Sequence, residues 1–221
     1  VSVRVNGQVT HLPQSATSTN ASGQWDREHR VYIVCTNLVI GSGGKIDVSR
    51  KGYQSGVSGS GYGPGGGVGG TTYGGGGYGG AGGVSTGGFG LAYGSMLDPE
   101  DPGSGGGGGA SGGLAGGGAV RIVATDDVTV DGSIIAGANA WGMHTWGAGS
   151  GGSVAISCRT IRGSGSVMAD GDNHYSGASG TPGGGGRIAV HFDATAQSNV
   201  VPRAAVSFSA GGGFRPTLGW E

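Results

Sequence analysis

Short apolar segments in which valine and isoleucine alternate with polar residues recur along most of the chain. Glycine, asparagine, aspartate or serine bounds each segment, and this combination is typical of β-strands. The segments predicted as strands are 31–40, 44–49, 119–124, 127–139, 153–158, 165–173, 186–192 and 204–210. No window has the i, i+3, i+4 spacing of a helix, and abundant glycine and β-branched residues disfavour helices. The pattern therefore predicts an all-β chain.

The predicted strands repeat along the sequence. Residues 116–139 align with residues 150–173 at an offset of 33 to 34 positions. The aligned pairs are Ile122 with Ile156, Gly132 with Gly165, Ile134 with Val167 and Ala136 with Ala169. A third copy places Ile188 in the position of Ile156, and an upstream half-copy, 37–53, places Ile46 in the position of Ile134. Each copy offers two predicted strands, and such a period is typical of solenoids, so we predict a β-solenoid of the right-handed parallel β-helix type.

Glycine is the second strong signal, with 58 glycines among 221 residues. A solenoid has two uses for glycine: positive φ angles at its turns, and close approach of stacked backbones. The tract 56–118 has no strict three-residue period, which excludes a collagen triple helix. We predict an ordered, partly polyproline-II-like face of the solenoid, with a silk-like fibre tract as the alternative. The tyrosines and Phe89 within this tract are expected to cover glycine surfaces.

Charge narrows the classes of partner. Only 11% of residues are charged and the formal net charge is -1, so no basic surface for nucleic acid is expected. No apolar run is long enough to span a membrane, so membrane insertion is not expected. Cys35 and Cys158 both lie in strand-like runs, which favours buried thiols over a disulfide but leaves their pairing open.

The order of motifs from Asn37 to Phe192 carries a resemblance. The segments "KIDVSRKGY", "GSGSVMADG" and "GGGGRIAVHF", with the glycine tract between them, resemble glycine-rich repeat regions of large secreted or surface bacterial proteins. The resemblance implies a parallel β-helix-like architecture and a secreted or cell-surface location. Residues 1–221 would form a single domain. Within it, 1–36 would be an N-terminal cap or strand, 37–192 the repeat region and 193–221 a closing segment.

Aromatic residues in two equivalent turns are the strongest candidates for a binding site. Trp141, His144 and Trp146 lie in the turn between two repeats, and His174 and Tyr175 lie in the same turn one repeat later. Equivalent turns of a solenoid stack on one side, which would align these side chains in a ridge. Flat rings beside hydrogen-bonding groups suit the C–H faces and hydroxyls of sugars. Structural packing and a protein interface remain the alternative roles.

Acidic clusters raise the question of catalysis and of metal binding. Glycoside hydrolysis needs two carboxylates about 5–10 Å apart, and "DPEDPG" offers Asp98, Glu100 and Asp101. The prolines around these acids favour a turn instead. Asp170 and Asp172 of "ADGDN" could ligate calcium, although a turn held by Asx hydrogen bonds is favoured.

The sequence predicts a non-catalytic extracellular surface or adhesion module that binds polysaccharide or a cell-surface glycan through the aromatic turns. No catalytic residue is assigned. One alternative is a polysaccharide lyase or glycoside hydrolase on a β-helix scaffold. The other is a self-assembling structural subunit of an extracellular fibre, with end strands or the glycine face as the joint.

Overall fold

The computed structural model describes residues 1–138, 145–174 and 180–214. The chain is nearly all β, with three parallel sheets. Sheet A contains β1 (Ser2–Val5), β4 (Asn37–Ile40), β7 (Asp127–Val130) and β10 (Thr160–Arg162), in that order. Sheet B contains β13 (Ser207–Ser209), β11 (Ser166–Met168), β8 (Ser133–Ile135), β5 (Lys45–Asp47) and β2 (Gln8–Val9). Sheet C contains β12 (Arg187–His191), β9 (Ser153–Ser157), β6 (Ala119–Ala124) and β3 (Val31–Cys35).

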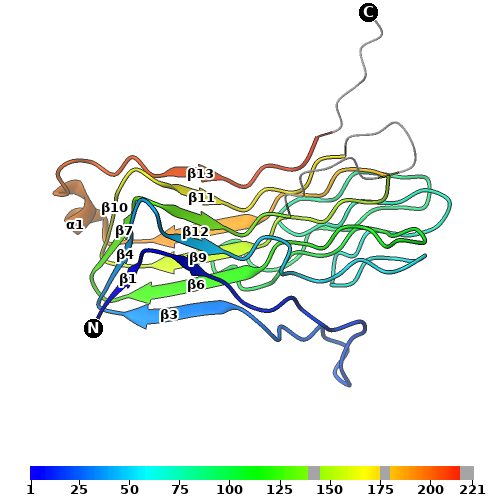
Figure 1. Ribbon diagram of the computed structural model, residues 1–221, viewed down its shortest axis with the longest axis horizontal. Coiled ribbons are helices and arrows are strands. Elements are labelled where there is room, and N and C mark those ends of the chain that lie inside the picture. Colours follow the sequence, from blue (N-terminus) through cyan, green and yellow to red (C-terminus); the bar gives the residue numbers. More distant parts are fainter. Residues whose placement is uncertain (139–144, 175–179, 215–221) are drawn as a thin grey trace, which may run out of the picture.

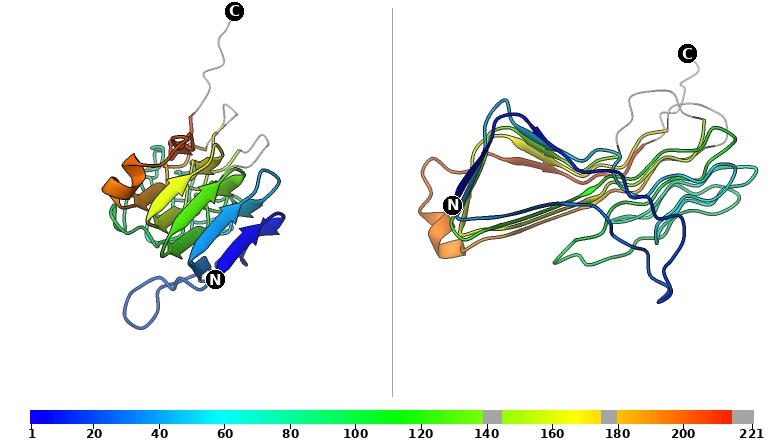
Figure 2. Two further views of the ribbon diagram at one scale, coloured as in Figure 1. Left: turned by 90° about the vertical axis from the view of Figure 1, so that its left-hand side faces the viewer. Right: turned by 60° about the horizontal axis from the view of Figure 1, so that its bottom comes forward.

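The chain visits the three sheets in a constant order, C then A then B. Three successive passages follow this order: β3–β4–β5, β6–β7–β8 and β9–β10–β11. In the right-hand view of Figure 2 the passages overlie one another. Each repeat therefore supplies three strands, and the prediction of two was wrong. The missed middle strands, β7 and β10, are short and are separated from their neighbours by only two or three residues, so the sequence pattern merged or skipped them.

Strand register tests the predicted alignment directly. Ile122 pairs with Ile156, Ile134 with Val167, and Ile46 with Ile134, which confirms these three alignments. The alignment of Ile188 was wrong, because Ile188 pairs with Val154 and Val190 lies opposite Ile156. A shift by two residues keeps every side chain on the same face of a strand, so alternation alone cannot detect it.

The apolar core fills the space between the sheets. Inward-facing Leu38, Ile46, Ile122, Ile134 and Ile156 are fully buried. Complete burial of one such side chain contributes about 1.5–3 kcal/mol to stability. Because successive passages place isoleucine, leucine or valine at the same inward position, the core is a continuous column along the stack.

The two cysteines lie at the edge of this core, and both are free thiols. Cys35 is buried, and Cys158 is half-buried and packs against the core. Burial raises the pKa of the Cys158 thiol to about 11 and also raises the pKa of Cys35. The sequence preference for unpaired thiols is confirmed.

The connections from sheet B to sheet C all leave the sheets at the same end and pack against one another. We call the segments 52–118, 147–152 and 180–186 the glycine region (Figure 1). Segment 102–109 is buried along its whole length. Its backbone is hydrogen-bonded to four other segments: 53–62, 67–74, 114–117 and 147–150. The region is thus a bundle of chains joined by their main-chain groups.

Close backbone approach explains the glycines of this bundle. A Cβ at Gly105 would overlap the carbonyl group of Gln54, and one at Gly106 would overlap that of Gly147. Positive φ angles occur at only a few described glycines, such as Gly63 and Gly112. Of the two uses predicted for glycine, close approach is therefore the one that accounts for most of the bundle.

A short helix replaces a strand in the last passage. After β12 the chain forms α1 (Ala194–Ser198), whose N-terminus is capped by the Asp193 carboxylate. The Gln197 side chain donates to the carbonyl of Ile161 and accepts from its N–H, at 2.9 and 2.7 Å. It thereby occupies the edge of β10 that a further strand of sheet A would use. The sequence analysis missed this helix, although Asp193 before an alanine-containing run is a recognisable N-cap signal.

Candidate functional site

Two of the five predicted sugar-binding residues, Trp146 and His174, lie in the described part of the chain. Trp141, His144 and Tyr175 lie outside the described residues. Trp146 is half-buried at the border of the glycine region. Its ring meets the Tyr73 ring edge to face, with centroids 4.8 Å apart and planes at 85°. The same indole lies directly over Gly109, where a Cβ would overlap it.

His174 comes close to Trp146 through a shared glycine. The side chain of His174 is fully buried. A Cβ at Gly180 would lie 2.6 Å from the His174 Nε2 atom and would overlap the Trp146 carbonyl oxygen. Tyr73 forms a β-bridge with the same Gly180. Tyr73, Trp146 and His174 therefore converge on Gly180, and we call these three residues the Trp146 cluster.

Within this cluster the side chains have different access to solvent. Trp146 and Tyr73 each keep part of their surface exposed, whereas His174 is fully buried. A ring held by a perpendicular ring and by a glycine backbone loses little conformational freedom when it binds a ligand. The cluster is thus a fixed aromatic platform at the end of the molecule where chain connections gather.

Other aromatic rings also lie against glycines, as expected. Trp25 packs edge to face against Tyr53, with centroids 5.5 Å apart, and Tyr78 packs against Tyr93 at 4.8 Å. The Tyr53 ring lies 2.5 Å from where a Cβ of Gly63 would be. These rings provide apolar surface that the glycines lack.

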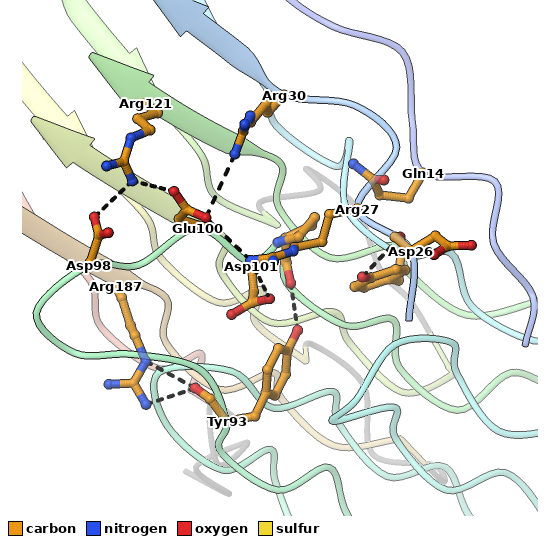
Figure 3. A network of polar contacts seen from close by, with 12 residues as sticks. Gln14, Asp26, Arg27, Arg30, Tyr93, Asp98, Glu100, Asp101, Arg121 and Arg187 are labelled. Atoms are coloured by element: carbon orange, nitrogen blue, oxygen red, sulfur yellow. Dashed lines mark hydrogen bonds and ion pairs between the residues drawn. The ribbon is translucent and has the colours of Figure 1, made fainter. Parts of the chain in front are cut away.

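The segment 98–103, which we call the acidic loop, is the centre of the polar network drawn in Figure 3. Glu100 forms ion pairs with Arg27, Arg30 and Arg121. Asp98 also contacts Arg121, at 2.8 Å, and Asp101 contacts Arg27 at 3.4 Å. Arg121 belongs to β6 and Arg30 directly precedes β3, so the network ties the loop to the outer face of sheet C.

Two further contacts fasten the residues just before the acidic loop. The Arg187 guanidinium of β12 donates to the Tyr93 carbonyl at 2.9 Å and lies over the Tyr78 ring. His191 Nε2 lies 2.6 Å from the Leu97 carbonyl oxygen. Burial raises the pKa of Asp101, while the positive charge of Arg27 partly opposes this shift. The acids of this loop are evident in the sequence, but no sequence pattern identifies their arginine partners.

The carboxylates proposed for calcium accept hydrogen bonds from the protein, and Asp170 contacts the segment 209–211. Asp170 accepts hydrogen bonds from the Ser209 hydroxyl and the Gly211 N–H. Asp172 is buried and accepts from the Asn173 N–H. Over residues 1–138, 145–174 and 180–214 there is no group of three or more His, Cys, Asp or Glu side chains placed to hold a metal ion. A calcium site at Asp170 and Asp172 stays a prediction.

Comparisons of the chain with protein families, with curated proteins and with solved structures find no match. Within the described residues, no helix has the length and apolar character needed to cross a membrane.

Proposed function

We propose that the chain is one β-solenoid, coiled as a right-handed parallel β-helix. In this arrangement the glycine region, formed by connections from sheet B to sheet C, is a polyproline-II-like bundle. The constant order of sheets in successive passages supports the solenoid. Crossovers between parallel strands are right-handed in about 98% of cases, which favours this hand. Main-chain hydrogen bonds from one segment to several neighbours, without sheet pairing, favour the polyproline-II-like arrangement.

We propose that this scaffold is a non-catalytic module of a secreted or cell-surface protein, and that it binds polysaccharide through the Trp146 cluster. The observation that carries the proposal is the partly exposed Trp146 ring, fixed edge to face against Tyr73 and packed on Gly109. The C–H face of a sugar ring packs on such an indole. Trp141, His144 and Tyr175 are close in sequence to Trp146 and His174 and would complete the site.

The geometry of the acidic loop favours binding over catalysis. A lyase or hydrolase would need carboxylates free to face the scissile bond. Glu100 is held by three arginines and Asp101 by Arg27, so both carboxylates act in fastening the loop. We therefore place the enzymatic alternative second.

Affinity electrophoresis in gels containing plant, algal or bacterial polysaccharides tests the proposal. We expect at least one polysaccharide to retard the wild type and Trp146→Ala to reduce the apparent affinity at least tenfold. Trp25→Ala is the matched control, because Trp25 also packs edge to face on a tyrosine beside glycines but lies outside the site. Equal loss in both variants, or retardation unchanged by Trp146→Ala, would contradict the proposed site. New reducing ends released from the polysaccharide would contradict the non-catalytic role.

A further inference from the structure

The last passage of the chain departs from the repeat at the junction of sheets C and A. In earlier passages a strand of sheet C leads directly into a strand of sheet A, as from β9 to β10. After β12 the chain instead forms α1, at the opposite end of the long axis from the glycine region (Figure 1). A break in an otherwise regular pattern is where function is expected to override structural consistency.

Phe192 lies at the centre of this break. It directly follows β12, is 47% exposed, and lines three adjoining hollows. The hollow toward α1 has a volume of about 430 Å³, and the hollow toward β9 has a volume of about 460 Å³. Both hollows are open to solvent, and the one toward β9 is the shallower, so they suit a polymer that lies along the surface. The third hollow, of about 240 Å³, is lined by apolar side chains at the end of the core column.

Charge distinguishes the two larger hollows. Among the described residues, Arg203 is the one charged residue that lines the hollow toward α1. Arg203 is exposed and makes no ion pair with any residue that the structure describes. The hollow toward β9 contains Arg159, which is paired with Asp126 at 3.4 Å, and the carboxylate of Asp193. The first hollow therefore attracts an anionic group, whereas the second carries the surplus negative charge of Asp193 and suits neutral polar groups.

The wall between α1 and the sheets is fixed. The Gln197 side chain makes both of its hydrogen bonds to Ile161, and the Ser198 hydroxyl donates to the Thr195 carbonyl at 2.8 Å. Asp193 is likewise engaged with the N–H groups of α1. The lining side chains left to contact a ligand in the hollow toward α1 are thus chiefly the Phe192 ring and the Arg203 guanidinium.

We propose that Phe192 and Arg203 form a second binding site, separate from the Trp146 cluster, for a carboxylated sugar residue of an acidic polysaccharide. The C–H face of the sugar packs on the phenyl ring, and the carboxylate accepts hydrogen bonds from the guanidinium, whose planar fork matches it. The adjoining sugar of the same chain, a neutral one, lies in the hollow beside Arg159 and Asp193. Two neighbouring hollows on either side of one ring fit a polymer better than an isolated small molecule.

Titration calorimetry with hyaluronan oligosaccharides, in which a uronate alternates with a neutral sugar, tests this site. We expect the wild type to bind, Arg203→Gln to weaken binding at least tenfold, and Phe192→Leu to weaken it at least fivefold. Arg50→Gln is the matched control, because Arg50 is exposed and has no ion pair among the described residues. Its affinity should equal that of the wild type. Binding to wild type should weaken as salt increases, since the contact is ionic and exposed.

Three outcomes would overturn the proposal: no binding by wild type, equal loss in Arg203→Gln and Arg50→Gln, or preference for a neutral oligosaccharide. Binding of sulfated dextran in place of the uronate would overturn the assignment to a carboxylate. Phe192→Leu keeps apolar volume and removes the flat ring, and a thermal melt of each variant checks that it is folded. Trp146→Ala should leave uronate binding unchanged, so failure at one site is distinguishable from failure at the other.

Discussion

The three sheets and the glycine region exclude water by different means. Among the sheets, side chains such as Ile122, Ile134 and Ile156 fill the interior, and the backbones stay apart at the walls. In the glycine region the backbones themselves fill the interior, and segment 102–109 is buried with hardly any side chain. The first arrangement depends on apolar volume, whereas the second depends on the absence of a Cβ.

The two regions also differ in how main-chain groups are satisfied. A strand such as β8 is hydrogen-bonded to two neighbours in one sheet, β5 and β11. Segment 102–109 is hydrogen-bonded to four segments around it. A buried backbone needs partners for its N–H and C=O groups, and the bundle supplies them on several sides. An added methyl group is therefore expected to destabilise the glycine region most, whereas a removed methyl group is expected to destabilise the core between the sheets.

The largest effect is expected from Gly105→Ala. The added methyl would overlap the Gln54 carbonyl, a main-chain group that cannot rotate away. We expect a loss of about 3 kcal/mol or more in the free energy of unfolding, at or above the upper end of usual overpacking costs. Gly7→Ala is the control, because a Cβ at Gly7 would meet nothing within 4 Å. Urea denaturation measures both variants, and equal stability would refute the close-packed bundle.

A smaller loss is expected when the sheet core is made smaller. Ile122→Val removes one methylene group from a fully buried site and should cost about 0.5–1.5 kcal/mol. Val34→Ala, at a position 63% exposed on β3, should change stability by less than about 0.5 kcal/mol. Denaturation midpoints of the two variants give the comparison. Similar losses in both would mean that the column of isoleucines is not the core.

The smallest effect on the free energy of unfolding is expected from Asp101, in the acidic loop that connects the glycine region with sheet C. Burial raises the pKa of Asp101, so the folded state binds this proton more tightly than the unfolded chain. The contribution of Asp101 to stability therefore falls as pH rises from its ordinary pKa of 3.8 through the raised value. Asp101→Asn should remove this slope.

The contribution of Glu28 to stability is expected to depend on pH in the opposite direction. Hydrogen bonds from the backbone and the hydroxyl of Ser15 lower its pKa, so its contribution is present above the unfolded pKa and is lost as pH falls. Urea denaturation from pH 3.5 to 6.5 of wild type, Asp101→Asn and Glu28→Gln should give difference curves of opposite slope. Parallel curves would show that Asp101 is not desolvated by the packed loop.

Much of the sheet region could be predicted from sequence. Alternation located 119–124 and 153–158 to within a residue of β6 and β9, and the repeat gave the pairing of Ile122 with Ile156. The repeat gave the wrong partner for Ile188, because a shift by two residues preserves the alternation. It also failed for α1, because a five-residue helix has too few residues to show a helical period.

The candidate site was predicted only in part. The aromatic turns pointed to Trp146 and His174, and the two residues approach each other at Gly180, which follows the second repeat. The contribution of Tyr73 could not be read from the sequence, because 73 residues separate it from Trp146 in a tract without a regular period. The same holds for the arginines around Glu100, which come from distant strands and loops.

By itself the sequence determined an all-β chain with a stacked repeat and a glycine-dense segment, because side-chain alternation and glycine content are local properties of the chain. Only the tertiary structure decided which backbones meet in the glycine region, which ring packs on Gly109, and where the repeat breaks at Phe192. A glycine has no side chain whose pattern could identify its neighbour. Its contacts are set by the register of whole segments, and that register is fixed only when the sheets have assembled.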